Sequence, residues 1–583
     1  EQSVAEVRCW QGEEMIKKPW KLFPRPLMES ILKSHGAQDR VHQPLIIHGP
    51  RGVGKTTLIM ESLLEGWNDG PHITAYVDFA HSTEKSLMIH NNRPWASWLA
   101  SLDQKPALAD CRMLLEKSLE NLALEGVYLG VITSSQIFST LNKWHNLETA
   151  LVRIMEQHSP GSSKTKNAAR RKVPASVLWE RAVQALSVRS NSSANNEVLE
   201  LVDGEDKLTL EEASFFREAA AALKLAKQLL EMQLAWRRNA IASLNKSNGF
   251  SRPLANACTN WPCLLIELLS QSAEAGHFQP KLVINNIEFL KHAVLTDDTM
   301  VSGPLYHDSL IWRIIALGVN EKCIPVMIIT SDSYYSHRAF IDFGFPDLFI
   351  SREFFGWTVE QAEIHMVPDY FSESEWKVIA NVLGPNIRHL SELFALKMNS
   401  YYEEVLEDKS ATLEDLLDTY LAHLQVEVVD PAMEKALSIV LKFAQDVRDK
   451  KIPDTHLRFG AAWRHPPKVD DPGLNKGWAK LQLMDFVHGF VHAEFGVNYS
   501  SDPSLEIFDD PCTGALIEVG LIYCQRDPPF LRPLSIGIQR CIVRWLIQER
   551  LMLNFPATVG YWWHRIIRGR YYRHLMNQVG YKT

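Results

Sequence analysis

The sequence has few cysteines, no long hydrophobic run and no excess of positive charge. Eight cysteines are scattered through 583 residues without a repeating spacing, and the closest pair is Cys258 and Cys263. This spacing excludes a disulfide scaffold or a zinc ribbon and indicates reduced thiols in an intracellular compartment. No apolar run reaches about 18 residues, so no transmembrane helix is predicted. The formal net charge of −8 argues against a protein that coats nucleic acid, but it leaves room for a local basic patch.

The composition is that of an ordinary globular protein. Hydrophobic residues make up 46% of the chain and charged residues 22%. At about 150 residues per domain, the length suggests about three or four domains. The sequence begins at Glu1 rather than Met, and its first ten residues lack the character of a signal peptide. That start fits a processed protein of the mitochondrial or plastid interior and fits a shortened chain equally well.

Alternating strand and helix patterns indicate an α/β core. Helical patterns cover residues 56–66 and 309–318. Short runs of apolar, β-branched or aromatic residues predict strands at 44–47, 73–79, 282–284, 326–330 and 348–351. Because strands that alternate with helices are joined by right-handed crossovers, we expect a mainly parallel sheet.

A long interval separates the second and third predicted strands. Within it, residues 159–172 and 189–196 have the composition of flexible loops. Residues 209–245 predict a long amphipathic helix in which Phe216, Leu223 and Leu230 recur at heptad spacing. That stripe is compatible with a coiled-coil partner, but a helix packed inside its own domain is the favoured interpretation.

Beyond residue 355 the pattern becomes helical. A further helix is predicted after Asp430, and residues 516–535 predict a helix that ends near Gly520, followed by two short strands around a polar turn. A helix followed by such a ribbon is the pattern of a winged helix. Three pairs match the N-cap and N3 signature of a helix start: Thr358 with Gln361, Ser372 with Glu375, and Thr412 with Asp415.

The run LIIHGPRGVGKTTL contains a complete phosphate-binding loop, or P-loop, between an apolar strand and a helix. Glycines let successive backbone N–H groups face the phosphates. Lys55 reaches the β- and γ-phosphates, and the Thr56 hydroxyl is a ligand for magnesium. We therefore expect bound ATP with Mg²⁺. The residues expected to bind the nucleotide are Gly49, Pro50, Arg51, Gly52, Val53, Gly54, Lys55, Thr56 and Thr57.

The acidic residues that hydrolysis requires are missing from the expected place. The strand KLVINNIEFL ends with Asn285 and Asn286, where two carboxylates should hold magnesium and polarise the attacking water. An amide accepts no proton and binds a hard cation more weakly than a carboxylate does. Glu288 and Asp78 are the candidate catalytic carboxylates, although a plain polar strand end is the favoured interpretation of Asp78. Thr56 and Asn285 are the candidate metal ligands.

Together these motifs resemble the AAA+/STAND group of P-loop ATPases, especially archaeal-type ATPases and origin-recognition-like proteins. The resemblance covers residues 44–82 and 281 to about 535. It implies that Thr330 or Ser331, at the end of VMIITSD, senses the γ-phosphate. GPNIRHLSEL is similar to the lid motif of the family, with Ile387 in place of a proline. The resemblance implies that Arg388, at the basic position, is a sensor that reaches the phosphates, and a plain surface arginine is an equal alternative. The resemblance does not imply ATP hydrolysis, because Asn285 and Asn286 replace the acidic pair of the family.

The expected architecture is an α/β P-loop NTPase core with a helical insertion, a helical lid and a C-terminal winged helix. The expected segments are residues 1–42, an N-terminal segment; 43–82 and 280–355, the nucleotide-binding core; 83–279, the insertion; 356–428, the lid; 429–550, the winged-helix-like domain; and 551–583, a basic aromatic tail.

The last part of the tail, residues 561–583, has five Lys or Arg residues and no carboxylate. Arginines pair with phosphates or carboxylates, and aromatic rings stack on bases or are buried at interfaces. A packed C-terminal helix with solvated arginines is the favoured interpretation, ahead of a protein partner, nucleic acid and an anionic membrane surface. The aromatic and basic residues alternate: Trp562, Trp563, Tyr571 and Tyr572 with Arg565, Arg568, Arg570 and Arg573.

Three functions follow as hypotheses. The first is a nucleotide-dependent switch or scaffold in a larger assembly, with weak or absent hydrolysis and a protein partner. The second is an active ATPase that remodels a protein or nucleic-acid partner. The third is an origin-recognition-like protein that binds DNA through the winged helix or residues 561–583. Phosphate release separates the first two, and the salt dependence of nucleic-acid binding tests the third.

Overall fold

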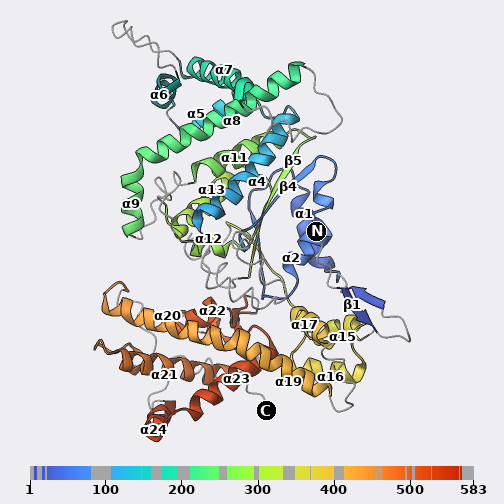
Figure 1. The fold of residues 1–583 in the computed structure, drawn as a ribbon, viewed down its shortest axis with the longest axis vertical. Helices are drawn as coiled ribbons and strands as arrows, with labels where there is room; N and C mark the ends of the chain where they lie inside the picture. The colour runs from blue at the N-terminus through green and yellow to red at the C-terminus, as the bar shows by residue number, and fades with distance from the viewer. Residues whose placement is uncertain are drawn as a thin grey trace.

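The computed structural model places the helices of the insertion, a central parallel sheet and the C-terminal helices in three successive tiers (Figure 1). It describes residues 6–9, 16–19, 23–80, 107–145, 147–158, 174–193, 210–247, 259–294, 301–331, 348–367, 369–398, 412–452, 457, 462–492, 496–501, 506–526, 528–563 and 565–566. Within these ranges, no helix carries the stretch of uncharged, apolar sequence that a bilayer crossing requires.

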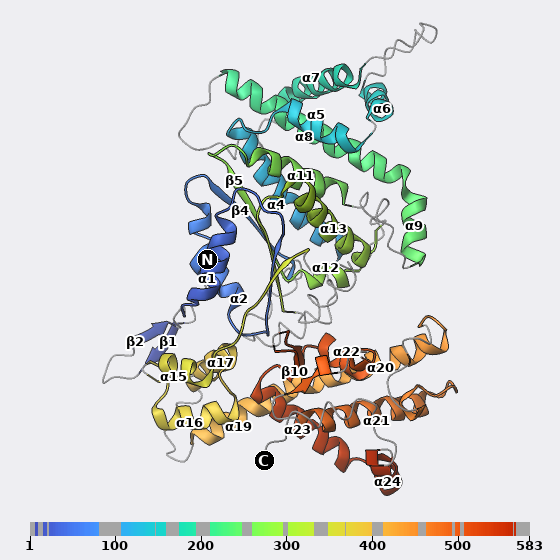
Figure 2. The same ribbon diagram turned by 180° about the vertical axis from the view of Figure 1, so that it is seen from behind.

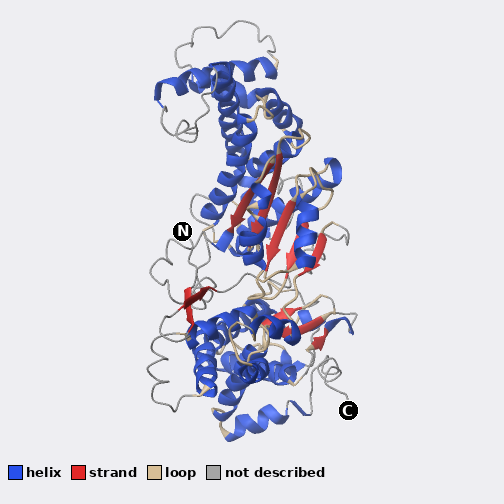
Figure 3. Ribbon diagram, turned by 90° about the vertical axis from the view of Figure 1, so that its right-hand side faces the viewer, coloured by secondary structure: helices blue, strands red, loops and turns tan. Residues whose placement is uncertain are grey.

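The central sheet confirms the predicted α/β core. Its five strands are all parallel and lie in the order β4-β5-β6-β3-β7. The three central strands are almost wholly buried, as expected for a parallel sheet covered on both faces (Figure 3). The strands are β3 (Leu45–His48), β4 (His72–Asp78), β5 (Gln279–Asn285), β6 (Val326–Thr330) and β7 (Ile350–Glu353).

Alternating side chains of the strands pack against two different helical layers. Leu45 and Ile47 face a cluster formed with α1 (Pro26–Gly36) and the helical turn after the P-loop. Ile46 faces the opposite cluster, formed with the helices of the other layer (Figures 1 and 2). This separation follows from the two-residue period of a strand. The helices of the other layer are α4 (Leu108–Tyr128), α11 (Asn260–Ser272), α12 (Glu288–His292) and α13 (Gly303–Glu321).

The insertion is helical, as predicted, but two of its predicted boundaries are wrong. Residues 189–193, expected in a flexible loop, belong to α7, and the predicted helix 209–245 is divided between α8 and α9 at Arg237. Residues 159–172 lie outside the described part of the chain. The helices after α4 are α5 (Ser134–Trp144), α6 (Glu148–His158), α7 (Ala175–Ser193), α8 (Leu210–Trp236) and α9 (Arg238–Ser247).

The heptad stripe of α8 is used within the insertion itself. Leu223 and Leu230 are buried in the same hydrophobic cluster as α4 and the sheet, and Phe216 is partly buried against it. The helix packs on α5 and α7. The favoured interpretation, a helix packed inside its own domain, is therefore confirmed for these three residues.

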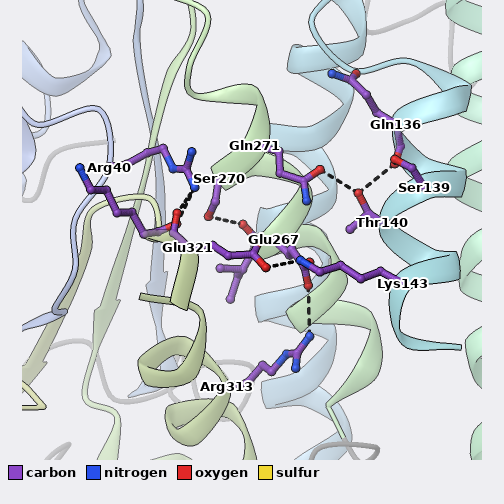
Figure 4. Close-up of polar contacts among 12 residues, drawn as sticks. Arg40, Gln136, Ser139, Thr140, Lys143, Glu267, Ser270, Gln271, Arg313 and Glu321 are labelled. Carbon is purple, nitrogen blue, oxygen red and sulfur yellow. Dashed lines mark hydrogen bonds and ion pairs between the residues drawn. The ribbon is translucent and has the colours of Figure 1, made fainter. Parts of the chain in front are cut away.

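A buried carboxylate joins the insertion to the helices of the core. Glu267 of α11 is fully buried. Its carboxylate accepts hydrogen bonds from Lys143 Nζ of α5 at 3.3 Å and from Arg313 Nη2 of α13 at 3.1 Å (Figure 4). Lys143 also pairs with Glu321 at the end of α13. The cluster thus connects three helices through one carboxylate.

All three predicted capping pairs are present as reciprocal capping boxes, at Thr358, Ser372 and Thr412. They begin three of the helices that follow the sheet. These helices are α15 (Val359–Met366), α16 (Glu373–Val382), α17 (Ile387–Lys397) and α19 (Leu413–Leu424).

The predicted start of a helix near Asp430 is only half correct. Helix α20 (Asp430–Arg448) is assigned from there, but it continues directly from α19 through the π-helical turn Gln425–Val429. Pro431 lacks an N–H group and would crowd the carbonyl of Glu427, so a widened turn at this place relieves the conflict. The expected boundary between residues 428 and 429 therefore falls inside a continuous helix.

The predicted helix and ribbon near Gly520 are present, together with a strand that sequence reasoning missed. Gly520 has φ +73 after the helix, a conformation that glycine adopts without strain. Strand β8 (Val497–Asn498) adds to the ribbon, and the antiparallel order is β8-β10-β9. The other elements are α21 (Pro472–Val491), α22 (Pro511–Glu518), β9 (Ile522–Cys524), β10 (Phe530–Pro533), α23 (Ile536–Leu551) and α24 (Phe555–Trp563).

The described part of the basic tail packs against the C-terminal helices. The hydroxyl of buried Tyr561 lies 2.7 Å from His488 Nδ1. Arg565 pairs with Asp485 at 3.1 Å, so the expectation that the tail arginines are solvated is wrong at this position. A nearby carboxylate satisfies the guanidinium inside the fold. Arg568, Arg570, Tyr571, Tyr572 and Arg573 lie outside the described residues.

Candidate functional site

The P-loop lies at the carboxyl end of β3, a strand flanked by β6 on one side and β7 on the other. Open α/β sheets bind ligands at this edge. Gly52 has φ +82 and Gly54 has φ +94, which turn the chain from the strand into α2 (Lys55–Thr57) and the π-helical turn Leu58–Leu63. A Cβ atom on Gly49 would lie 2.4 Å from the backbone oxygen of Phe354, so the close approach of β7 requires glycine there.

Lys55 lies inside the loop that it is expected to serve. Its Nζ donates hydrogen bonds to the backbone oxygens of Gly49, at 2.8 Å, and Pro50, at 2.9 Å. Burial lowers the pKa of Lys55 to about 7, and the negative charge of Glu288 opposes that shift. A phosphate group would add a negative charge at hydrogen-bond distance from the buried ammonium.

The ends of β4 and β5 bring Asp78 and the two asparagines together. Asn285 Nδ2 donates to Asp78 Oδ2 at 2.8 Å, and Asn286 Nδ2 donates to Asp78 Oδ1 at 2.7 Å. Asn285 Nδ2 also lies 3.2 Å from Thr56 Oγ1 in the P-loop. Asp78 ends β4, and its carboxylate is the centre of this cluster of amide donors. Asn286 adopts φ +54, a left-handed conformation that asparagine tolerates better than most residues.

Glu288 belongs to a different contact. Strand β5 ends at Asn285, so Glu288 begins α12 instead of sharing a strand face with Asn286. Its carboxylate accepts hydrogen bonds from Thr330 Oγ1 at 2.8 Å and from the backbone N–H of Ser331 at 3.3 Å. The two expected sensor residues are thus tied to the acidic residue that was the alternative catalytic candidate.

The start of α17 contacts the P-loop directly. Asn386 Nδ2 donates to the backbone oxygen of Arg51 at 3.2 Å, and the N–H of Arg388 lies 3.2 Å from the oxygen of Gly52. The guanidinium of Arg388 pairs with Glu392 at 3.2 Å, along its own helix. Sequence reasoning identified Arg388 but missed Asn386, whose side chain both caps α17 and contacts the loop.

A second contact to the P-loop strand comes from the C-terminal ribbon. His48, the residue before Gly49, is buried, and its Nδ1 lies 3.2 Å from the hydroxyl of Tyr523 on β9. Tyr523 donates that hydroxyl proton to Glu353, at the end of β7, at 2.9 Å. Burial lowers the pKa of His48 to about 3, so the imidazole is neutral. Because the Tyr523 proton goes to Glu353, His48 Nδ1 donates to the Tyr523 oxygen. A histidine that ends the apolar run LIIH was the signal in the sequence, and it was not used.

The chain matches no protein-family model, and a comparison with curated proteins found no match. In the described part of the chain, no three His, Cys, Asp or Glu side chains are grouped so that they could hold a metal ion. The arrangement offers a buried ammonium, a glycine-rich backbone and amide donors, which together can bind an anion such as a phosphate group.

Proposed function

We propose that this chain binds a nucleoside triphosphate, with ATP as the expected ligand, at residues 49–57, and acts as a nucleotide-dependent switch or scaffold in a larger assembly. The observation that carries the proposal is the buried Lys55 ammonium, held by two backbone oxygens inside a glycine-rich loop. Among the described residues, the hydrogen-bond partners of this ammonium are backbone oxygens and not carboxylates. A buried cation in such surroundings is costly to maintain, and a bound phosphate would offset that cost.

We further infer that the fold is that of a P-loop NTPase of the AAA+/STAND group, with α15 to α19 as the lid and the C-terminal ribbon as the wing. Two observations support this inference. The strand β3, which leads into the P-loop, lies inside a parallel sheet. Its two neighbours in that sheet, β6 and β7, come much later in the sequence. The helix α22 leads directly into the antiparallel strands β9 and β10.

The switch is inferred from what touches the loop. Asn386 and Arg388 hold its backbone from the lid, and Tyr523 holds the strand that leads into it. The Lys55 ammonium uses two of its three N–H groups on the oxygens of Gly49 and Pro50, so a phosphate would take the third and draw the ammonium and the loop toward itself. A ligand shifts a conformational equilibrium only through such differential contacts.

Hydrogen exchange tests the switch. ATP at about 100 times its Kd should slow amide exchange at the start of α17 and in β9 by up to about 100-fold, because opening of either contact would then release ligand. The amides of α7, which lies in the insertion away from these contacts, are the internal reference. Binding of ATP without any change at α17 or β9 would contradict the switch.

A separate prediction concerns turnover. The purified chain should release phosphate far below about 1 s⁻¹, the low end of ordinary enzymes, because Asn285 and Asn286 supply no base and Asp78 is engaged by both amides. The Lys55→Ala variant, purified identically, measures contaminating ATPase. Robust release that disappears in that variant would favour the active ATPase instead.

A further inference from the structure

The surroundings of the Thr56 hydroxyl differ from those of a magnesium site. From the sheet, the amide nitrogen of Asn285 lies 3.2 Å from Thr56 Oγ1. The orientation of this amide is determined by its neighbour, because the same nitrogen lies 2.8 Å from Asp78 Oδ2, and an ionised carboxylate only accepts hydrogen bonds. The amide oxygen of Asn285 instead accepts the backbone N–H of Asn286 at 3.1 Å.

The carboxylate of Asp78 is occupied by four donors. Oδ2 accepts from Asn285 and from the hydroxyl of Tyr76, at 3.3 Å. Oδ1 accepts from Asn286 and from the backbone N–H of Ala80, at 3.0 Å. An ionised carboxylate offers about four lone-pair positions, so a cation would have to displace a donor that is already in place.

Glu288, the other nearby acid, is turned toward β6. Its two oxygens accept from Thr330 Oγ1 and from the N–H of Ser331. Magnesium requires oxygen ligands at near-octahedral geometry and usually takes one or two carboxylates together with substrate phosphates. The groups around Thr56 therefore do not fit the magnesium ion that the AAA+/STAND resemblance implies.

We propose that the P-loop binds its nucleoside triphosphate without a divalent cation, because the Asn285 amide, whose N–H groups contact Asp78 and Tyr76, lies where a carboxylate would hold the cation. Positive charge comes instead from Lys55, buried in the loop, and from Arg51, which is close enough to influence the Lys55 ammonium. This inference rests on the proposed function, because it specifies the ionic form of the same ligand.

Calorimetric titration of the full chain with ATP tests it, once in magnesium and once in EDTA. The two Kd values should agree within about threefold, a difference of less than 1 kcal/mol. A loss of tenfold or more in EDTA, with binding intact in magnesium, would overturn this inference alone. No binding in either buffer would overturn the proposed function as well, so the two failures are distinguishable.

The Asn285→Asp variant provides a second measurement. It places a carboxylate beside Asp78 and Thr56, where two like charges favour a cation. Magnesium alone should raise the Tm of this variant but leave the Tm of the wild type unchanged. A rise of equal size in both proteins would show that the wild-type site already binds the ion and would contradict the proposal. The wild-type titrations decide the question even if the variant does not fold.

Discussion

Replacing Lys55 with alanine should weaken ATP binding by about 30-fold to several thousandfold. Removing one partner of a buried, hydrogen-bonded charge pair costs about 2–5 kcal/mol, and each 1.4 kcal/mol is about tenfold in affinity. Lys55 is buried in the loop, so water cannot replace its ammonium beside the phosphates. Calorimetry of both proteins in the same buffer measures the difference.

The same change at an exposed lysine is the control. Lys33 of α1 is largely exposed and lies 3.8 Å from Glu29, so Lys33→Ala should leave the ATP affinity unchanged. Circular dichroism and thermal melting establish that both variants are folded. If Lys55→Ala binds ATP as tightly as the wild type, residues 49–57 are not the nucleotide site.

Replacing Glu267 with alanine should strongly lower the free energy of unfolding. Removing one partner of a buried ion pair is destabilising by about 3–5 kcal/mol, because it leaves an uncompensated charge inside the protein. Here Lys143 and Arg313 would both lose their shared carboxylate. Lys143 is partly exposed and regains water, so the lower end of that range is expected. The midpoint of urea unfolding measures the loss.

Glu274→Ala is the matched control for Glu267→Ala. Glu274 pairs with Arg40 but is 69% exposed, and surface ion pairs contribute about 0–1 kcal/mol. The control should therefore shift the urea midpoint much less than Glu267→Ala does. Equal shifts in the two variants would show that the buried carboxylate does not hold the insertion on the core.

Local patterns predicted most of the secondary structure around the site. The strands β3 to β7 were expected within a few residues of their observed positions, and the short apolar runs of β3, β5 and β6 are typical of buried strands in a sheet covered on both faces. The capping boxes at Thr358, Ser372 and Thr412 were also predicted, because all of their atoms lie within four consecutive residues.

The predictions of secondary structure were wrong where contacts with the rest of the fold outweighed the local pattern. Composition indicated a loop at residues 189–196, but α7 continues to Ser193. Pro431 indicated that a new helix begins near Asp430, but the preceding helix continues through that point in a widened, π-helical turn. Strand β8 is only two residues long and forms because β10 provides a partner. So short a strand has no sequence pattern from which it could be predicted.

The sequence by itself determined the glycine-rich loop at residues 49–57, the parallel sheet that supports it and the absence of an acidic pair at the end of β5. Each of these depends on residue types in short, consecutive runs. Only the tertiary structure decided which side chains surround that loop. Asp78, Asn386 and Tyr523 come from segments far apart in the chain, and their contacts exist because the strands end at one edge of the sheet and the C-terminal domain packs against that edge (Figures 1 and 3). A hydrogen bond depends on distance and direction in space, and neither is encoded in the spacing of residues along the chain.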